Sequence, residues 1–402
     1  MNNPNNKVYI LTNGCPENRI DSSRMEEFFR KNGYKISRKI NQADLIIFNS
    51  CALTNDAEDS SIRLIGEIKK TMLPSAKLIV CGCLPKINPE RLRMVYQGPV
   101  FGSDELETLD EIFKSKLKSE KVYVNSLKEV TNCLDKHKWL IRNLNEDAIT
   151  AAIKILEKSR NRTDKAVNIC SPDIFCIKIC SGCLGNCSFC AVRLSRGLLK
   201  SKPLERVVHE FEEGLQRGYK KFALIGTEVG AYGKDLKTDL IVLLKELISR
   251  KGDYKISLRN LHPGYLIGMF PEFRKIFASG KIAFLACSPE SGNNRILGLM
   301  NRGYKIEDFK QAIGVLNREF PQIKIRTQLI VGFPTETEKE FQDSLRLLDE
   351  LRFDFVEVYA FEARKNTKAA AMRGQIPEKT KQKRYLKLLL KIIGNNFAAS
   401  RK

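Results

Sequence analysis

Three cysteines lie close together in the segment Cys183-Leu-Gly-Asn-Cys187-Ser-Phe-Cys190. The spacing C-x3-C-x2-C puts three thiolates on one tight loop, and such thiolate-rich runs favour zinc or iron–sulfur clusters. Closed sites of either kind take four protein ligands. Three thiolates on a 4Fe–4S cluster leave one iron open for a small molecule, as an open position marks a catalytic metal site. Two alternatives remain open: a zinc knuckle, with Cys180 as a fourth ligand, and thiols that bind no metal.

Three further cysteines, Cys15, Cys51 and Cys83, each follow a short apolar run. Helical patterns separate the runs, so the segment predicts a βαβαβ unit with a parallel sheet. The predicted strands are 8–11, 45–48 and 78–80, and the predicted helices are 24–31 and 57–70. Since the carboxyl ends of parallel strands share one edge, where ligands bind, these thiols should converge on a second metal cluster. The alternative is that each is a small buried hydrophobe, as we expect for Cys81.

From residue 166 onward, six apolar runs mostly alternate with helical patterns, which predicts an incomplete (β/α) barrel with its chemistry at the strand carboxyl ends. The predicted strands are 175–179, 222–225, 255–261, 282–286, 323–331 and 356–361. Glu228 follows the second run, where its carboxylate either meets an ammonium group or is a solvated surface acid. Arg196, shortly after the three-cysteine loop, faces either an anionic ligand or water.

The charge balance points to a polyanionic partner. The 402-residue chain has 69 Lys and Arg against 47 Asp and Glu, a net charge of +22. Such an excess favours RNA, although Lys-rich composition also serves solubility alone. Residues 364–402 hold twelve of the basic side chains and one acid. The helix expected at 377–393 places Leu386, Leu389, Leu390 and Ile393 in the core. It aligns Lys379, Lys383, Lys387 and Lys391 on a face that binds phosphate or is solvated.

Other features set the domain plan and the compartment. The N-terminus lacks the apolar run of a signal peptide, and no segment is long and apolar enough to span a membrane. With twelve cysteines, this indicates a reducing compartment, the cytoplasm. The expected divisions are 1–115, a connector at 116–165 with a helix at 146–158, the barrel at 166–376, and a basic helix at 377–402. His137 and Trp139 in the connector are expected to be packing residues.

The cysteine patterns and several further blocks resemble the radical SAM methylthiotransferase family over nearly the whole chain. Cys183, Cys187, Phe189 and Cys190 match its C-x3-C-x2-C signature, and Gly14-Cys15, Asn49-Ser50-Cys51 and Gly82-Cys83 match its second cluster site. The segment 182–197 is most similar to the branch that modifies N6-threonylcarbamoyladenosine in tRNA. Further matching blocks are Arg196-Gly197, 232–235, Ser291-Gly292, Met300-Asn301-Arg302, 330–334 and 336–338.

The resemblance implies two 4Fe–4S clusters, S-adenosylmethionine and a low-potential electron donor such as flavodoxin or ferredoxin. The cluster on Cys183, Cys187 and Cys190 would bind S-adenosylmethionine at its open iron and generate a 5′-deoxyadenosyl radical. That radical would take a hydrogen from C2 of the adenine beside the tRNA anticodon, and the cluster on Cys15, Cys51 and Cys83 would present the sulfur. The implied S-adenosylmethionine contacts are Phe189, Gly226, Thr227, Glu228, Ser291 and Arg302, with Glu228 at the methionine ammonium and Phe189 near the adenosine.

The sequence also departs from the family pattern. The usual C-terminal RNA-binding barrel, called TRAM, is not expected here, because the chain stops about where it would start. Glu290 replaces a usual Gln, Gln328 replaces a usual Asp, and the block 363–368 differs from the family's Pro-Arg-x-Gly-Thr-Pro. These departures leave the cluster chemistry intact and concern the substrate. Two alternatives therefore stand beside tRNA: the same chemistry on a protein, peptide or small molecule, and a zinc-stabilised RNA-binding protein without catalysis.

Overall fold

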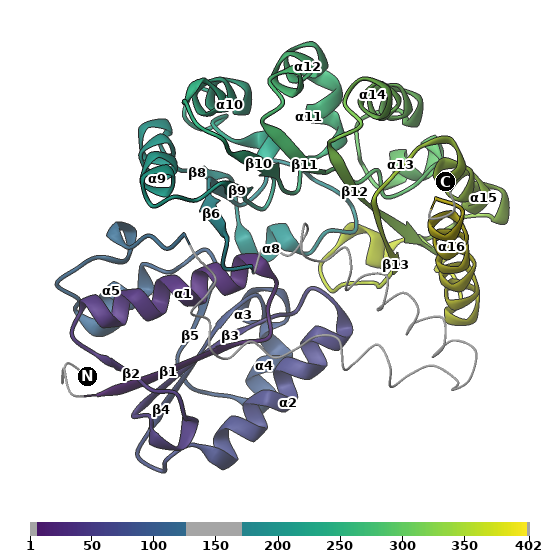
Figure 1. Ribbon diagram of the computed structural model, residues 1–402. Coiled ribbons are helices and arrows are strands. Elements are labelled where there is room, and N and C mark those ends of the chain that lie inside the picture. Colours follow the sequence, from purple (N-terminus) through teal and green to yellow (C-terminus); the bar gives the residue numbers. More distant parts are fainter. Residues whose placement is uncertain (1–5, 126–170, 400–402) are drawn as a thin grey trace. The chain divides into compact units, whose positions relative to one another are not determined.

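The computed structural model describes residues 6–125 and 171–399, and these form two compact units (Figure 1). Unit 1 comprises residues 1–176 together with 194–196, and unit 2 comprises 177–193 and 197–402. Most of the connector expected at 116–165, including its helix, His137 and Trp139, lies outside the described residues. No helix among the described residues is long and apolar enough to cross a membrane.

Unit 1 is built on a five-stranded parallel sheet in the order β2-β1-β3-β4-β5. This confirms the predicted parallel α/β fold and adds two edge strands that the sequence pattern did not indicate. The elements are β1 Lys7–Thr12, α1 Pro16–Lys31, β2 Lys35–Ile36, β3 Leu45–Ser50, α2 Asn55–Thr71, β4 Lys77–Gly82, α3 Leu84–Ile87, α4 Pro89–Val95, β5 Val100–Gly102 and α5 Thr108–Phe113. Short 3-10 turns occupy Ile40–Gln42 and Ser119–Lys121.

The alternation of side chains along the strands supplies the core of unit 1. Alternate residues of β1, β3 and β4, such as Ile10, Ile47 and Ile79, belong to one cluster with Phe28 and Phe29 of α1. Cys81 lies in this cluster and is fully buried, as expected for a core residue. The sheet is thereby fixed against α1, and the loops after β1, β3 and β4 are held at one edge.

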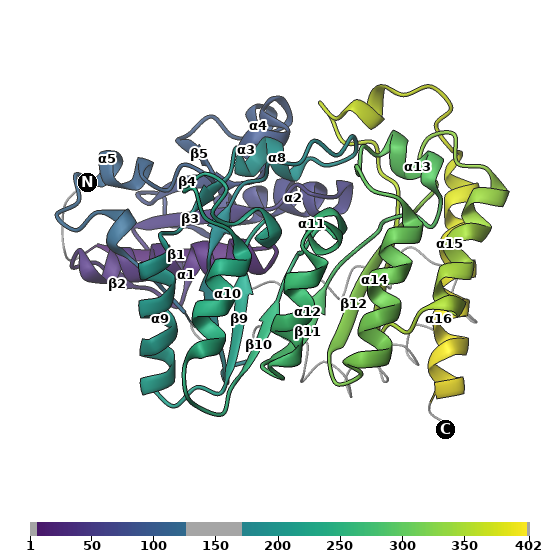
Figure 2. The ribbon, with the colours of Figure 1, turned by 90° about the horizontal axis from the view of Figure 1, so that it is seen from above.

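Unit 2 contains most of a six-stranded sheet in the order β13-β12-β11-β10-β9-β6, as expected for a partial barrel, and the first three residues of β6 belong to unit 1. Helices α9, α10, α12, α14 and α15 stand outside the strands (Figure 2). The strands are β6 Ile174–Lys178, β9 Lys221–Ile225, β10 Lys255–Leu258, β11 Ile282–Ala286, β12 Lys324–Val331 and β13 Phe355–Ala360. The main helices are α9 Leu204–Gln216, α10 Leu240–Ser249, α12 Phe270–Ala278, α14 Ile306–Glu319, α15 Glu338–Glu350 and α16 Glu378–Ala399.

Shorter elements complete the barrel's loops. They are β7 Cys180–Ser181, α8 Val192–Arg196, β8 Lys200–Ser201, α11 Pro263–Gly268 and α13 Asn294–Leu299, with 3-10 turns at Val229–Ala231 and Lys368–Ala371. The β7–β8 pair is antiparallel and flanks the three-cysteine loop in sequence. Predicted site residues follow three of the long strands: the three-cysteine loop follows β6, Gly226 to Glu228 follow β9, and Ser291 follows β11.

The core face predicted for the C-terminal helix is partly wrong. In α16 the fully buried apolar residue is Leu388, and Ile392 is nearly so, whereas Leu390 is 62% exposed. The reason is that the inner face also carries the basic residues Lys381 and Arg384, which an apolar pattern does not mark. Arg384 donates through Nη1 to Oε2 of Glu336 at 2.8 Å, so a buried ion pair holds the helix together with the buried apolar residues.

The lysine face of α16 is partly neutralised within the chain. Lys387 pairs with Glu338 at 2.9 Å, and Lys391 pairs with Asp349 at 2.5 Å, while Lys379 and Lys383 are exposed. For Lys379 and Lys383, both alternatives, a phosphate-binding face and an ordinary solvated face, therefore remain open predictions.

Candidate functional site

The three-cysteine loop of unit 2 is anchored by backbone hydrogen bonds to the segment after α13. Ser188 N donates to the Met300 carbonyl at 3.0 Å, and its hydroxyl donates to the Leu299 carbonyl at 2.8 Å. The Asn301 side chain donates to the Asn186 carbonyl at 2.8 Å. Phe189 packs against a buried cluster that includes Met300 and Phe333. The loop that carries the thiols is thereby fixed on two sides before any ligand binds.

Each thiol of this loop accepts a hydrogen bond from a different N–H donor. Cys183 Sγ accepts from Gly185 N at 3.1 Å, and Cys187 Sγ accepts from Arg302 Nη1 at 3.5 Å. Cys190 Sγ accepts from the backbone N–H groups at the start of α8. Burial, together with the neighbouring Cys187, raises the pKa of Cys190 to about 11, against the lowering effect of these N–H donors. Donors of this kind around thiolates orient metal ligands and tune bound clusters.

Gly226, Thr227 and Glu228 follow β9 at the same edge. Gly226 must be small, because a Cβ there would lie 2.5 Å from Cys180 Sγ. Thr227 Oγ1 accepts from Gly182 N at 3.2 Å, which links this turn to the start of the three-cysteine loop. Gly226, Thr227 and Glu228 are therefore close in space to the three-cysteine loop, although they are distant from it in the sequence.

Glu228 is buried, so the solvated-acid interpretation is wrong. Its Oε1 accepts from Gly230 N at 2.9 Å and from His262 N at 3.0 Å, and 8% of the residue is exposed. Burial raises the pKa of the Glu228 carboxyl to about 7, against the lowering effect of these two N–H donors and of Arg302. A carboxylate held in this way is poised to accept from a cationic group.

Ser291 comes from the loop after β11, and Arg302 comes from the loop after α13. Arg302 is buried, donates through Nη2 to the Ser288 carbonyl at 2.6 Å, and has no hydrogen-bond partner at Nε. Ser291 is fully buried, and its hydroxyl accepts from Asn293 N at 3.2 Å. An orphaned guanidinium N–H beside a thiol fits a site that takes a further acceptor.

The two departures from the family pattern, Glu290 and Gln328, are neighbours. Glu290 N donates to the Gln328 carbonyl at 3.3 Å, and the Gln328 amide donates to Glu357 Oε2 at 2.9 Å. Glu290 is 9% exposed and adopts φ +73°, a conformation that costs free energy for a residue with a side chain. Burial raises the pKa of Glu290 to about 7, and Arg302 lowers it.

Cys180, the candidate fourth ligand of a zinc site, makes a contact of its own. It is buried and its thiol donates to the Glu228 carbonyl at 3.4 Å. The described residues contain no group of three His, Cys, Asp or Glu side chains that could hold a single metal ion.

We therefore expect Cys180→Ala to keep the metal content of the wild-type protein, because this thiol is engaged with a backbone carbonyl beside Gly226. Iron and zinc per chain, measured after anaerobic purification of both proteins, check this expectation. A drop in bound metal in Cys180→Ala would show that the thiol is a ligand.

In unit 1, Cys15, Cys51 and Cys83 stand at the carboxyl ends of β1, β3 and β4, as predicted. Cys15 Sγ and Cys83 Sγ lie 3.6 and 3.8 Å from the same atom, Oδ1 of Asn18, so the two sulfurs are no farther apart than the sum of these distances. Cys83 also interacts electrostatically with Cys51. The three thiols, remote in sequence, are thus gathered in space.

A polar network fixes the loops that carry these thiols. Asn18 Nδ2 donates to Asn49 Oδ1 at 3.0 Å, and Asn13 Oδ1 accepts from Cys51 N at 2.9 Å. Gly82 has φ +97° and packs directly against the Ser50 backbone, while Cys83 N donates to the Ser50 carbonyl at 2.8 Å. Sequence reasoning missed Asn18 because nothing in the helical pattern marks a buried amide.

Arg196 is buried, so the prediction that it faces water is wrong, whereas the prediction that it faces an anionic ligand stays a prediction. It belongs to unit 1 and is 3% exposed. Its Nη1 donates to Asp21 Oδ2 at 2.5 Å and its Nη2 to Asn18 Oδ1 at 2.6 Å. Its positive charge lowers the pKa of Cys83, which burial raises, and it acts on Cys15 in the same direction.

By donor chemistry, both thiol triplets fit a soft iron–sulfur group. Each offers three sulfurs within one compact unit, and sulfur is the ligand atom that such soft metal groups prefer. The roles of the six cysteines as metal ligands stay predictions, as do the S-adenosylmethionine contacts.

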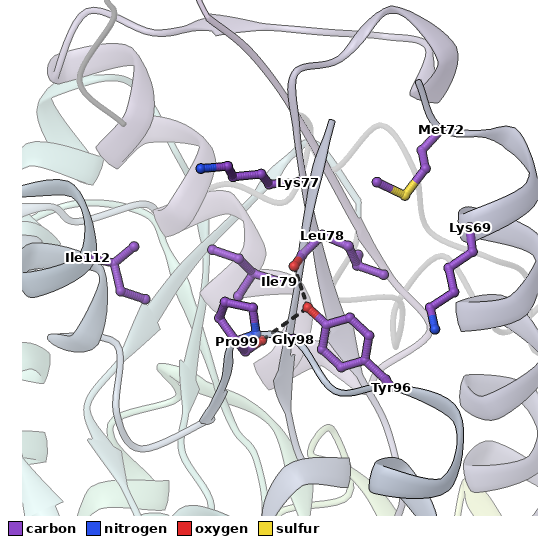
Figure 3. Close-up of a pocket in the computed structure, with 9 residues that line it drawn as sticks. All are labelled: Lys69, Met72, Lys77, Leu78, Ile79, Tyr96, Gly98, Pro99 and Ile112. Carbon is purple, nitrogen blue, oxygen red and sulfur yellow. Dashed lines mark hydrogen bonds between the residues drawn. The ribbon is translucent and has the colours of Figure 1, made fainter. Parts of the chain in front are cut away.

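A separate pocket lies on unit 1, near the amino end of β4 (Figure 3). Its volume is about 490 Å³, its walls are largely apolar, and the Tyr96 hydroxyl beside it donates to the Leu78 carbonyl. The lining residues are Lys69, Met72, Lys77, Leu78, Ile79, Tyr96, Gly98, Pro99 and Ile112. None of the predicted site residues lines this pocket.

Family models match both units. The model of the uncharacterized protein family UPF0004 matches residues 7–101, and that of the radical SAM superfamily matches residues 177–348. The first match includes Cys15, Cys51 and Cys83, and the second includes the three-cysteine loop.

Individual proteins are similar over most of the chain. The threonylcarbamoyladenosine tRNA methylthiotransferase MtaB of Thermotoga maritima is 32% identical over 380 residues, which cover 94% of this chain and 80% of that protein. The ribosomal protein uS12 methylthiotransferase RimO of Thermodesulfovibrio yellowstonii is 31% identical over 387 residues, covering 94% and 81%. The tRNA-2-methylthio-N(6)-dimethylallyladenosine synthase of the same organism is 29% identical over 390 residues, covering 95% and 82%.

A solved structure shares the fold. It is the radical S-adenosylmethionine methyltransferase TsrM from Kitasatospora setae with cobalamin and a [4Fe-4S] cluster bound, with a TM-score of 0.60 and 13% identity. The match covers 91% of this chain and 77% of that chain. At this level of identity the likeness concerns the fold.

Proposed function

Because this chain belongs to the radical SAM methylthiotransferase family, we propose that it inserts a methylthio group at C2 of a modified adenosine next to the anticodon of tRNA. The chain is an enzyme of this family, so the alternative of a zinc-stabilised RNA-binding protein without catalysis is wrong. A tRNA substrate implies work in the cytoplasm, with a low-potential donor such as flavodoxin or ferredoxin supplying electrons.

The gathering of two separate thiol triplets, one in each unit, carries the proposal. We assign one 4Fe–4S cluster to Cys183, Cys187 and Cys190. We assign the second to Cys15 and Cys83, which lie beside Asn18, and to Cys51, which interacts with Cys83. When bound, the clusters and S-adenosylmethionine supply the electron transfer, radical and sulfur chemistry of the reaction.

The residues of the chain bind and orient these groups. The buried Glu228 carboxylate, ionised, would accept from the methionine ammonium, and the free Nε of Arg302 would donate to an acceptor beside Cys187. Phe189 would lie near the adenosine, while Gly226, Thr227 and Ser291 shape the surrounding turns. Such fixed groups align reactants before the chemical step.

The choice of tRNA rests on the names of relatives and on charge. Several similar proteins, from Thermotoga maritima and from archaea, are named threonylcarbamoyladenosine tRNA methylthiotransferases. The net charge of +22 suits a polyanion. A protein substrate is the second candidate, because the relative named for ribosomal protein uS12 is 31% identical to this chain.

Mass spectrometry of tRNA nucleosides from cells that lack and cells that express this gene tests the proposal. We expect a 2-methylthio derivative of threonylcarbamoyladenosine only in the expressing cells. Unchanged nucleosides together with a methylthiolated ribosomal protein would establish the second candidate instead.

Binding of S-adenosylmethionine should strengthen as the pH rises through 7. The ammonium needs the Glu228 carboxylate ionised, and burial raises the pKa of that group to about 7. Protonation below this pH removes the acceptor, so the apparent affinity at pH 6.5 should be about fourfold weaker than at pH 8. Glu228→Gln should bind weakly at both pH values.

Equilibrium dialysis with radiolabelled S-adenosylmethionine, at equal iron content for both proteins, measures this difference. An unchanged pH dependence in Glu228→Gln would assign the titration to another group.

A further inference from the structure

We propose that Ser195 and Arg196, which follow the three-cysteine loop in the sequence, serve the other cysteine triplet and hold its thiolates in place for the second cluster. The inference rests on the proposed second cluster and does not depend on the substrate. It assigns a positioning role, since neither side chain is itself a thiolate ligand.

The first observation is the position of the pair in the fold. Cys190 belongs to unit 2, but residues 194–196 belong to unit 1. Both side chains are almost completely buried there, Ser195 at 0% exposed and Arg196 at 3%. Ser195 and Arg196 therefore follow the three-cysteine loop in the sequence but belong to the unit that holds Cys15, Cys51 and Cys83.

Ser195 contacts Cys83 directly. Its hydroxyl hydrogen-bonds the Cys83 thiol, as does that of Ser103. Ser103 Oγ in turn donates to the Ser195 carbonyl at 2.9 Å. The Cys83 sulfur thus has two hydroxyl neighbours. Because the Ser103 proton is directed to the Ser195 carbonyl, the Ser195 hydroxyl, from the segment after the three-cysteine loop, is the one that can donate to a thiolate.

Arg196 acts through Asn18. The Asn18 Oδ1 atom lies near Cys15 and Cys83, and it accepts from Arg196 Nη2 at 2.6 Å. Thiolates bound to iron have no proton to donate, so on cluster binding the amide oxygen would lose both thiol donors. Arg196 remains as its donor, which keeps Asn18 oriented between the cysteine loops.

Arg196 also supplies charge. A cluster on three thiolates brings negative charge into a region where the sulfur of Cys83 and the guanidinium are both buried. The positive charge of Arg196 interacts with Cys15 and Cys83. Asp21 and Glu17 balance part of that charge, at 2.5 and 3.9 Å from the guanidinium. The competing explanation is that Arg196 forms only a structural ion pair with Asp21.

Iron content distinguishes the two explanations. Two 4Fe–4S clusters give about eight irons per chain. We expect Arg196→Gln to fall toward about four irons, with Mössbauer spectra that keep one cluster, and to retain cleavage of S-adenosylmethionine. Arg196→Lys should recover part of the loss, and Ser195→Ala should lose less iron than Arg196→Gln.

Two controls separate cluster binding from folding. Arg24→Gln removes a guanidinium of the same unit that donates to the backbone carbonyls of Val122 and Ser119, away from the thiols, and should keep about eight irons. Asp21→Asn removes the acidic partner but leaves Arg196 beside Asn18, and should also keep them. A structural ion pair alone would make Asp21→Asn and Arg196→Gln equally deficient.

About eight irons in Arg196→Gln would overturn the inference, as would parallel loss of iron and of S-adenosylmethionine cleavage. If Arg196→Gln does not fold, as judged by circular dichroism, the comparison of Ser195→Ala and Arg196→Lys with wild type decides. A wild-type protein with only about four irons would instead defeat the proposed second cluster itself.

Discussion

Replacing Cys187 with Ala should stop cleavage of S-adenosylmethionine, whereas Cys51→Ala should leave cleavage intact and stop methylthio insertion. The reason is the proposed division of labour between two thiol sets in different units. Loss of an outer-shell partner typically costs roughly 10–100-fold in metal affinity or activity. Loss of a thiolate that binds iron should exceed this, so the affected step should fall below detection.

Two assays on one anaerobic preparation measure the separate steps. Chromatography detects 5′-deoxyadenosine as the product of cleavage, and mass spectrometry of the substrate detects the methylthio group. Cys81→Ala is the matched control, because that cysteine lies one residue before Gly82 but belongs to the apolar core. Methylthiolated product from Cys51→Ala would show that the second triplet does not deliver the sulfur.

Gly82→Ala should destabilise unit 1 and empty the second cluster site. At φ +97° a side chain is strained, at a cost on the order of 1–3 kcal/mol. An added Cβ would also meet the Asn49 amide oxygen and the Ser50 backbone, including Ser50 N at 2.8 Å. Because Cys83 follows directly, relief of this clash moves a proposed ligand. We expect a lower melting temperature and about four irons per chain instead of about eight.

Gly66→Ala is the matched control for this change. Gly66 is exposed within α2, and a Cβ there would meet nothing within 4 Å. Ala is favoured over Gly inside a helix by about 1 kcal/mol. The control should therefore melt slightly higher than wild type and keep its iron. A wild-type melting temperature and iron content in Gly82→Ala would contradict the role given to this turn.

The grouping of the six cysteines into two sets could be predicted from the sequence because two simple patterns mark them. Cys183, Cys187 and Cys190 are close in the chain, and Cys15, Cys51 and Cys83 each end an apolar run of a parallel sheet. The topology then brings the latter three together without any information about side-chain contacts. This reasoning predicted the fold class of both units and the sheet edge, at the carboxyl ends of the parallel strands, where the cysteines of unit 1 lie.

The start of α1, the strand β5 and the burial of Arg384 could not be predicted from apolar patterns. Buried polar residues do not produce such a pattern. Helix α1 begins at Pro16 rather than at Arg24, and its first half buries Asn18, Asp21 and Ser22 in the network beneath the thiols. The edge strand β5 spans three residues, too few to show alternation. In α16, the burial of Arg384 depends on Glu336, which is remote in the chain.

The return of residues 194–196 to unit 1 has a consequence for dissecting the protein. The polypeptide leaves unit 1 after residue 176 and re-enters it eighteen residues later. A truncated polypeptide ending at the first crossing would lack Ser195 and Arg196, so cutting the gene between its two matched families would separate Cys83 from two of its neighbours. A version of unit 1 that is expressed alone, or exchanged with that of a relative, should therefore include residues 194–196.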